Sequence, residues 1–252
     1  MGQHGKHRAL VIGATARALG VLAIAGAAAP AMAQPICRLA LVLALDVSAS
    51  VDAREDALQR EGLARALLAP EVQTAFFSGD LPVALSVFEW SGRWNQEMIL
   101  DWTLIGSPAD LRRASARVGA SRRSYSQFPT AMGYAMGYAA QYLRDGPACL
   151  FRTVDVSGDG VNNEGFGPRL AYENFPFADV TVNGLVILGA DPDEDAKIAA
   201  FYAGEVVHGP GAFVEAADGF ADFERAMRRK LERELRAATI GALPGAQPAV
   251  PG

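Results

Sequence analysis

Residues 39–50 read LALVLALDVSAS, and this stretch decides how the rest of the chain is interpreted. An uninterrupted apolar run is followed at once by a carboxylate, Asp46, and by two hydroxyls, Ser48 and Ser50. A short apolar run that leads into a helical pattern is typical of a buried parallel strand. A tight turn after such a strand would bring the three polar side chains together. They would offer only hard oxygen atoms, which Mg²⁺, Mn²⁺ and Ca²⁺ accept as ligands.

Residues 1–33 have the pattern of a secretory signal peptide. Three basic residues and no acidic residue are followed by an Ala-rich apolar run that ends in Ala31-Met32-Ala33. This pattern predicts cleavage after Ala33 and a periplasmic or secreted protein. An uncleaved membrane anchor fits less well, because the apolar run is short for a span. No later segment is apolar over a sufficient length to cross a bilayer.

The remaining chain is predicted to form one domain, residues 34–240, followed by a disordered tail rich in Pro, Ala and Gly, residues 241–252. Loss of the three basic residues with the signal peptide would change the formal net charge from −5 to −8. A charge of this sign argues against nucleic acid or an anionic membrane surface as a partner.

The two cysteines of the chain each precede a predicted strand. Cys37 lies nine positions before Asp46, and Cys149 lies ten positions before Asp159. If the two strands are parallel neighbours, both sulfur atoms lie at the same edge of the sheet and can form a disulfide, which an oxidising compartment permits. Two free buried thiols are the alternative. The disulfide is favoured, because cysteine pairs in exported chains usually bridge.

Strand-like and helix-like stretches alternate along the domain. The predicted strands are residues 39–45, 82–90, 94–102, 150–156, 180–188 and 212–216, and the predicted helices are residues 51–68, 107–118, 130–140, 168–178, 193–202 and 220–236. Residues 91–93 form a turn between two strands, which predicts an antiparallel hairpin. The fold class is therefore α/β: a doubly wound, mostly parallel open sheet with one antiparallel edge strand and helices on both faces.

Ligands of open α/β sheets bind beyond the carboxyl ends of the strands. The loop after the first strand, residues 46–50, is expected there. The loop Ser157-Gly158-Asp159-Gly160 follows the strand at 150–156, and its glycines allow a tight turn that brings Asp159 forward. Thr130, at the start of a helix rich in small residues, is a third contributor.

These residues match the metal-ion-dependent adhesion site of von Willebrand factor A domains, whose pattern is Asp-x-Ser-x-Ser, then a distant Thr, then an Asp that usually precedes Gly. The chain resembles that family over about residues 37–237, with Asp46-Val47-Ser48-Ala49-Ser50, Thr130 and Asp159-Gly160 in the matching order. It is also similar to a bacterial family of exported von Willebrand A-like proteins with no assigned function, through residues 155–160 and 209–214.

The resemblance implies a divalent-cation site and a protein-binding function without enzymatic activity. By that resemblance Ser48 and Ser50 bind the cation directly, Thr130 binds it directly or through water, and Asp46 and Asp159 act largely through water and hydroxyl groups. Mg²⁺ is the expected cation, with Mn²⁺ and Ca²⁺ as alternatives. The expected partner is a protein that offers an Asp or Glu to the cation.

Three details of the site are open at this stage. Thr130 follows Phe128-Pro129 rather than the glycine-containing loop of the family, so Ser124 or Ser126 could replace it, and Thr130 could also serve as a helix N-cap. Asp155 lies inside a central strand, where a carboxylate is costly unless paired. It either supports Asp159 from behind or pairs with an arginine such as Arg152.

Other interpretations explain fewer residues. Residues 155–160 resemble the start of an EF-hand loop, but Phe166 stands where the bidentate Glu is required. A metal-dependent hydrolase acting on phosphorylated or acidic substrates and a structural domain of the cell envelope are the alternative functions. Five arginines, Arg112, Arg113, Arg117, Arg122 and Arg123, are interpreted as a solvated basic face that could attract an acidic partner.

Overall fold

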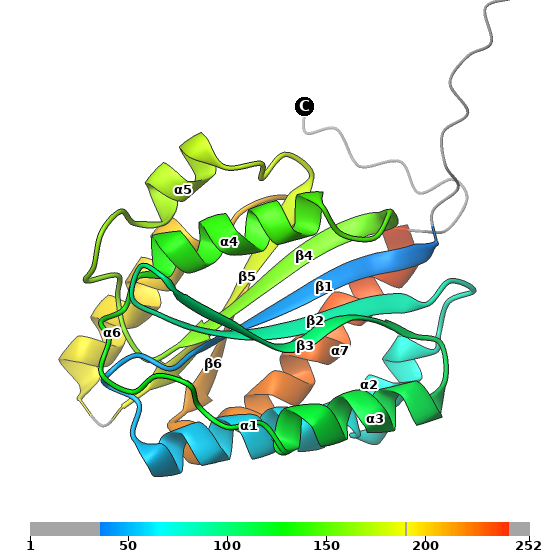
Figure 1. The fold of residues 1–252 in the computed structure, drawn as a ribbon, viewed down its shortest axis with the longest axis horizontal. Helices are drawn as coiled ribbons and strands as arrows, with labels where there is room; N and C mark the ends of the chain where they lie inside the picture. The colour runs from blue at the N-terminus through cyan, green and yellow to red at the C-terminus, as the bar shows by residue number, and fades with distance from the viewer. Residues whose placement is uncertain (1–35, 190, 242–252) are drawn as a thin grey trace, which may run out of the picture. The chain divides into compact units, whose positions relative to one another are not determined.

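The computed structural model describes residues 36–189 and 191–241. The predicted signal segment and all of the predicted tail except Gly241 lie outside these residues. Six strands form one sheet in the order β3-β2-β1-β4-β5-β6, and only the pairing of β2 with the edge strand β3 is antiparallel. Helices cover both faces of this sheet (Figure 1). The predicted fold class is confirmed.

The elements follow the predicted order along the chain. The strands are β1 (Cys37–Asp46), β2 (Val83–Ser91), β3 (Asn95–Ile105), β4 (Cys149–Gly158), β5 (Val180–Leu188) and β6 (Val214–Asp218). The helices are α1 (Ala53–Leu67), α2 (Pro70–Phe76), α3 (Pro108–Gly119), α4 (Met132–Arg144), α5 (Pro168–Asn174), α6 (Pro192–Phe201) and α7 (Phe223–Gly241). Across the described residues, none of the helices combines the length and the apolar character that a bilayer crossing requires.

The central strand β1 divides the core between two helical layers. All ten of its residues are buried, as expected for a strand covered on both faces. Its leucines at 39, 41, 43 and 45 pack in the cluster with α1, α2, α3 and α7, whereas Ala40, Val42 and Ala44 pack in the cluster with α4 and α5. The apolar run in the sequence thus reflects burial on both sides rather than on one.

The start of the first helix and the region around Pro70 differ from the prediction for local reasons, and the other helices differ from it at their ends. Asp52 caps α1 and forms a reciprocal capping box with Glu55, so the helix begins after the polar loop instead of at residue 51. Pro70, which we interpreted as a stop signal, begins the separate helix α2 as its first residue. A proline fits this position because its missing N–H has no partner in the first turn of a helix.

The small residues of α4 allow close packing, as predicted. A β-carbon at Gly133 would lie 2.1 Å from the carbonyl oxygen of Phe166, and one at Gly137 would lie 2.8 Å from the ring of Phe175. A larger side chain at Gly133 would overlap the backbone of Phe166, and one at Gly137 would displace the Phe175 ring. The helix therefore lies directly against the chain that leads into and out of α5, close to the loop that follows β4.

The two cysteines form a disulfide, as favoured from the sequence. Cys37 is directly opposite Cys149 in the parallel register of β1 and β4. The bond lies at the amino ends of both strands, opposite the edge that carries Asp46. It closes a loop with a sequence separation of 112 residues, which includes β2, β3 and the four helices α1 to α4.

We expect replacement of both cysteines by alanine to lower the free energy of unfolding by about 2–5 kcal/mol, because a cross-link over so long a loop restricts the unfolded chain. Urea denaturation of the wild type and of Cys37→Ala/Cys149→Ala measures the difference. A reducing agent should lower the stability of the wild type toward that of the variant and leave the variant unchanged. Equal stability of the two oxidised proteins would contradict this expectation.

Candidate metal centre

The loop after β1 turns its three polar side chains toward one another. The backbone N–H of Ser48 donates to Asp46 Oδ1 at 2.8 Å, a local bond that tightens the turn. The hydroxyls of Ser48 and Ser50 are hydrogen-bonded at 3.2 Å. Asp46 and Ser48 are buried, whereas Ser50 is exposed. The loop therefore carries a line of oxygen atoms from the sheet edge out to solvent.

Residues from two distant loops complete this cluster. The hydroxyl of Thr130 donates to Ser48 Oγ at 3.2 Å, and the hydroxyl of Ser50 donates to Asp159 Oδ1 at 2.8 Å. The structure thus brings together all five residues expected from the sequence: Asp46, Ser48, Ser50, Thr130 and Asp159. The loops that carry Ser48 and Asp159 follow the carboxyl ends of β1 and β4, where ligands of this architecture bind, and the loop between α3 and α4 brings Thr130 to the same place.

Backbone hydrogen bonds on both sides hold the segment that carries Thr130. The carbonyl of Phe128 accepts from Ala49 at 2.8 Å, and the carbonyl of Pro129 accepts from Gly92 at 2.7 Å. The N–H of Thr130 donates to Asn163 Oδ1 at 2.9 Å. The glycine-containing loop that the family usually has at this point is thus replaced by a segment tied to three neighbouring loops.

Thr130 is not the N-cap of α4. Ala131 occupies that position without a side-chain cap, and Asn162 Oδ1 instead accepts from Gly133 N at 3.3 Å. The threonine hydroxyl is therefore available to the cluster. Ser124 and Ser126, the alternatives to Thr130, are both exposed, and Ser124 uses its backbone N–H to bind Glu89.

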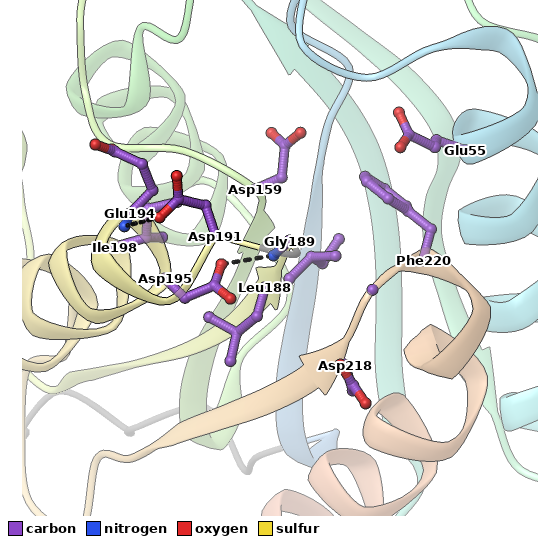
Figure 2. Close-up of a pocket in the computed structure, with 12 residues that line it drawn as sticks. Glu55, Asp159, Leu188, Gly189, Asp191, Glu194, Asp195, Ile198, Asp218 and Phe220 are labelled. Atoms are coloured by element: carbon purple, nitrogen blue, oxygen red, sulfur yellow. Dashed lines mark hydrogen bonds between the residues drawn. The ribbon is translucent and has the colours of Figure 1, made fainter.

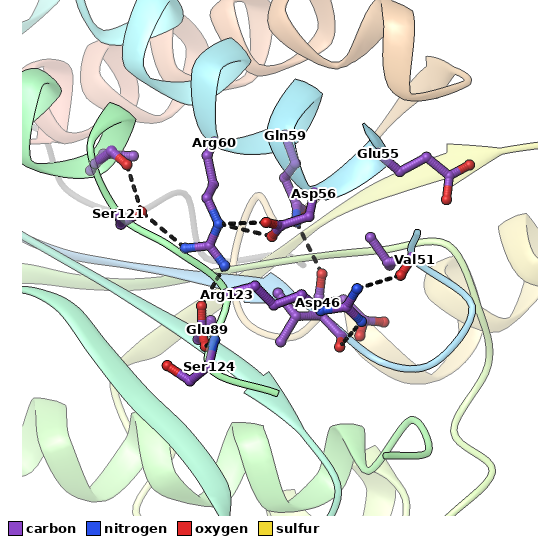
Figure 3. A network of polar contacts seen from close by, with 12 residues as sticks. Asp46, Val51, Glu55, Asp56, Gln59, Arg60, Glu89, Ser121, Arg123 and Ser124 are labelled. Atoms are coloured by element: carbon purple, nitrogen blue, oxygen red, sulfur yellow. Dashed lines mark hydrogen bonds and ion pairs between the residues drawn. The ribbon is translucent and has the colours of Figure 1, made fainter. Parts of the chain in front are cut away.

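Arg123 binds the turn that carries the cluster and is not part of a solvated basic face, whereas Arg112, Arg113, Arg117 and Arg122 are exposed as expected. Its guanidinium donates to the carbonyls of Val47 and Val51 at 2.6 Å each and to that of Ser48 at 2.7 Å (Figure 3). One side chain thus fixes the whole turn after β1. The sequence did not predict this role. Every residue has a backbone carbonyl, so the partners of Arg123 cannot be recognised from their residue types.

A buried arginine, Arg60, anchors the elements around the turn. Arg60 of α1 forms ion pairs with Asp56 at 2.8 Å and with Glu89 of β2, and Glu89 also accepts from the N–H of Ser124 at 2.7 Å. Gln59, next to it on α1, donates to the carbonyl of Asp46 at 3.0 Å (Figure 3). This network ties α1, β2 and the loop before Thr130 to the end of β1.

Asp155 takes a different partner from those expected. It forms an ion pair at 2.8 Å with Lys230 of α7, which also binds Glu234 at 2.6 Å, and Lys230 is fully buried. Neither Arg152 nor Asp159 is its partner. Burial raises the pKa of Asp155, whereas the Lys230 ammonium group opposes that effect. The sequence could not show this pair, because the two residues come together only when α7 packs on the sheet.

The electrostatics of the cluster favour a cation. Burial, together with the nearby charge of Asp159, raises the pKa of Asp46 to about 7, and burial also raises the pKa of Asp159. Asp46 Oδ2 is buried and has no hydrogen-bond partner. An unpaired buried carboxylate oxygen is costly. The donor set of hydroxyl and carboxylate oxygens therefore fits a hard divalent cation.

A cavity of about 440 Å³ opens on one side of Asp159. Its wall contains six carboxylate side chains, namely Glu55, Asp159, Asp191, Glu194, Asp195 and Asp218 (Figure 2). Several of them have local structural roles, among them Glu55 in the capping box of α1. Asp191 caps α6, and Asp195 Oδ1 accepts from Gly189 N at 2.6 Å. The sequence did not indicate this cavity, because its residues come from four separate segments.

The fold is that of a von Willebrand factor A-like domain. Residues 36–239 match the family described as "Protein of unknown function (DUF1194)", and the chain belongs to that family. No curated protein sequence matches the chain.

Solved structures with this fold are similar over most of the domain. A von Willebrand factor type A protein from Catenulispora acidiphila has a TM-score of 0.52 and 14% identity and covers 81% of this chain and 43% of its own. Proximal thread matrix protein 1 from the mussel byssus, with a zinc-occupied MIDAS motif, has a TM-score of 0.54 and 14% identity over 81% of this chain and 49% of its own. The pilus adhesin SpaC from Lactobacillus rhamnosus GG, in an open conformation, has a TM-score of 0.56 and 15% identity over 82% and 30%.

The chain spans less than half the length of each of these three proteins. At such low identity, the likeness shows the fold and not the activity.

We expect Asp46→Asn to stabilise the cation-free protein increasingly as the pH rises. Because the pKa of Asp46 is raised from 3.8 to about 7, protonation favours the folded state, and this contribution is lost as the pH rises through 7. The variant cannot ionise there. Its advantage over the wild type should widen between about pH 4 and 7 and level off above, at no more than roughly 4 kcal/mol.

Urea denaturation in excess chelator across this pH range measures the difference. Asp80→Asn, at an exposed aspartate away from the cluster, is the control and should show no such widening. A difference between Asp46→Asn and the wild type that stays constant from pH 4 to 8 would contradict the expected burial effect.

Proposed function

We propose that this chain is an exported protein-binding domain that recognises its partner through a divalent cation. The observation that carries the proposal is the cluster at the sheet edge. Five oxygen-bearing side chains from three loops meet there, and the buried carboxylate Asp46 keeps one oxygen without a hydrogen-bond partner. The arrangement has the composition that a small, hard cation requires.

The side chains divide into neutral and charged groups. We assign direct binding of the cation to Ser48 and Ser50, direct or water-mediated binding to Thr130, and support through water and hydroxyl groups to Asp46 and Asp159. Neutral hydroxyl ligands leave the charge of the cation only partly balanced. When bound, the cation would supply a positive centre that accepts a carboxylate from another molecule.

The expected cation is Mg²⁺, with Mn²⁺ and Ca²⁺ as alternatives. Hydroxyl and carboxylate oxygens without nitrogen or sulfur suit these ions better than softer metals. The mussel protein with the similar fold is described with zinc in its MIDAS motif, so a zinc-containing measurement belongs beside the magnesium one.

The partner is a protein that presents an Asp or Glu side chain. Adhesins are among the structures with this fold, which supports recognition as the activity. The Cys37–Cys149 disulfide supports an oxidising location, periplasmic or extracellular, in keeping with the predicted signal peptide. The carboxylate-lined cavity beside Asp159 repels a highly acidic surface, so a single acidic side chain on a neutral or basic surface fits this face best.

Cation binding should be measurable as stabilisation. At a Mg²⁺ concentration about 100 times the dissociation constant, the wild type should gain about 2.7 kcal/mol and its melting temperature should rise by several degrees. Ser48→Ala/Ser50→Ala should lose this gain. Thermal unfolding with Mg²⁺, Mn²⁺, Ca²⁺ or Zn²⁺ and with chelator gives the comparison.

Ser86→Ala/Ser115→Ala is the matched control, because both serines are buried and bind only backbone carbonyls and neighbouring side chains away from the cluster. It should be less stable than the wild type but keep the full response to the cation. An equal response in the Ser48/Ser50 variant and in the wild type would rule out the assigned ligands.

Partner binding should depend on the same residues. We expect the wild-type protein with Mg²⁺ to co-purify a partner from the native cell envelope, and we expect chelator and Ser48→Ala/Ser50→Ala to abolish that recovery while the Ser86/Ser115 control retains it. Equal recovery under all conditions would contradict cation-mediated recognition and favour a structural role. A phosphatase screen tests the hydrolase alternative, and turnover lost in Asp46→Ala would overturn our choice.

A further inference from the structure

Two buried polar atoms without a hydrogen-bond partner face the same small space beside the cluster. One is Asp46 Oδ2 and the other is the hydroxyl of Tyr202. A β-carbon built at Gly158 would lie 2.7 Å from Asp46 Oδ2 and 2.8 Å from the Tyr202 hydroxyl oxygen. Both atoms therefore lie close to the position that a side chain at residue 158 would occupy.

The sheet has a slot that fits the Tyr202 ring. Gly184 of β5 is opposite Val156 of β4, so Gly158, two residues further along β4, lies on the same face of the sheet as Gly184. A β-carbon at Gly184 would lie 2.6 Å from Tyr202 Cδ1. Glycine weakens a strand interior and often marks the close approach of another group. Two glycines on neighbouring strands thus make room for this one side chain.

The backbone before and after Tyr202 also departs from regular structure. The helix α6 ends at Phe201 and continues as a π-helical turn, Tyr202–Val206, in which Val207 N donates to the Tyr202 carbonyl at 3.1 Å. Such wide turns are rare in proteins, and those that occur are often found at functional sites. The irregularity begins at the residue whose ring enters the slot, and Tyr202 is fully buried there.

We propose that Tyr202 is a positioning residue for the cation site, whose hydroxyl donates a hydrogen bond to Asp46 Oδ2 when the cation is bound. The inference rests on the proposed function, since it assigns to Asp46 a role at a bound cation. No feature of the sequence pattern that identified the cluster includes this tyrosine.

The hydrogen bond from the Tyr202 hydroxyl to Asp46 Oδ2 would affect the orientation and the charge of the Asp46 carboxylate. An ionised carboxylate only accepts hydrogen bonds, and a tyrosine hydroxyl is a donor at neutral pH. Asp46 Oδ1 already accepts from Ser48 N. A donor at Oδ2 would fix the plane of the carboxylate and favour its charged form, which is the form that supports a cation.

The test compares Tyr202→Phe with the wild type. The variant keeps the ring in its slot and removes only the hydroxyl. We expect its dissociation constant for Mg²⁺, measured by calorimetry, to rise about 10- to 100-fold, as is typical when a partner of a metal-supporting group is lost. Its melting temperature in chelator should stay the same or rise slightly, because a buried hydroxyl without a partner is removed.

Tyr172→Phe is the matched control. The Tyr172 hydroxyl binds the carbonyl of Val206 on the same π-helical turn but lies away from Asp46. This variant should lose stability in chelator and keep the wild-type affinity for Mg²⁺. A structural role for Tyr202 would give that same result, so the two substitutions separate stability from cation binding.

A spectroscopic measurement on the unmutated side chain completes the test. In protein labelled with ¹³C at tyrosine Cζ, the Tyr202 resonance, assigned by its loss in Tyr202→Phe, should shift when Mg²⁺ is added, and the Tyr172 resonance should not. Unchanged Mg²⁺ affinity in Tyr202→Phe together with an unmoved resonance would overturn this inference alone. Failure of the wild type to bind any divalent cation would overturn the proposed function as well.

Discussion

The parallel, in-register pairing of β1 with β4 is the constraint on which the rest of the structure depends. Cys37 is opposite Cys149 at one end of the pair, and Leu45 is opposite Ser157 at the other. Because side chains alternate along a strand, a slip of one residue would move the leucines of β1 to the face that packs against α4. The same slip would separate Asp46 from the loop that carries Asp159. The same strand register therefore places the disulfide at one end of the β1–β4 pair and the cluster at the other.

The distribution of buried charge singles out one carboxylate. Glu89 of β2 is opposite Leu45 and Asp155 of β4 is opposite Leu43, and these two carboxylates each have a basic partner, Arg60 and Lys230 respectively. Within the described part of the chain, Asp46 has no such partner. Arg123 comes close but donates its hydrogen bonds to backbone carbonyls. Burial raises the pKa of Asp46, and a bound cation would balance the charge of its carboxylate.

Local patterns in the sequence predicted most of the architecture. The apolar run of β1 and the turn between β2 and β3 were sufficient for the sheet class and the antiparallel edge, because burial and turn chemistry are local properties. The motif order was sufficient to bring Thr130 and Asp159 to Ser48 and Ser50. Helix α2 was missed because Pro70 has the same appearance as a stop signal and as a first helical residue.

The contacts that the sequence could not provide all depend on packing between distant elements. Arg123 was interpreted as one of several surface arginines, and only the folded loop shows that it binds Val47 and Ser48. Asp155 was recognised as a carboxylate that needs a partner, but Lys230 lies far away on α7 and gave no signal. Tyr202 was only the last residue of a predicted helix, and the slot that it fills became visible through Gly158 and Gly184.

Hydrogen bonds within the cluster have a consequence for affinity. Thr130, Ser48, Ser50 and Asp159 already form a connected chain of side-chain bonds, and Arg123 holds the turn beneath them. The loss of conformational entropy on ordering these side chains therefore occurs when the domain folds rather than when a cation binds. Preorganisation of this kind strengthens binding without adding contacts. The hydrogen bonds that anchor these loops would therefore strengthen cation binding as well as hold the loops in place.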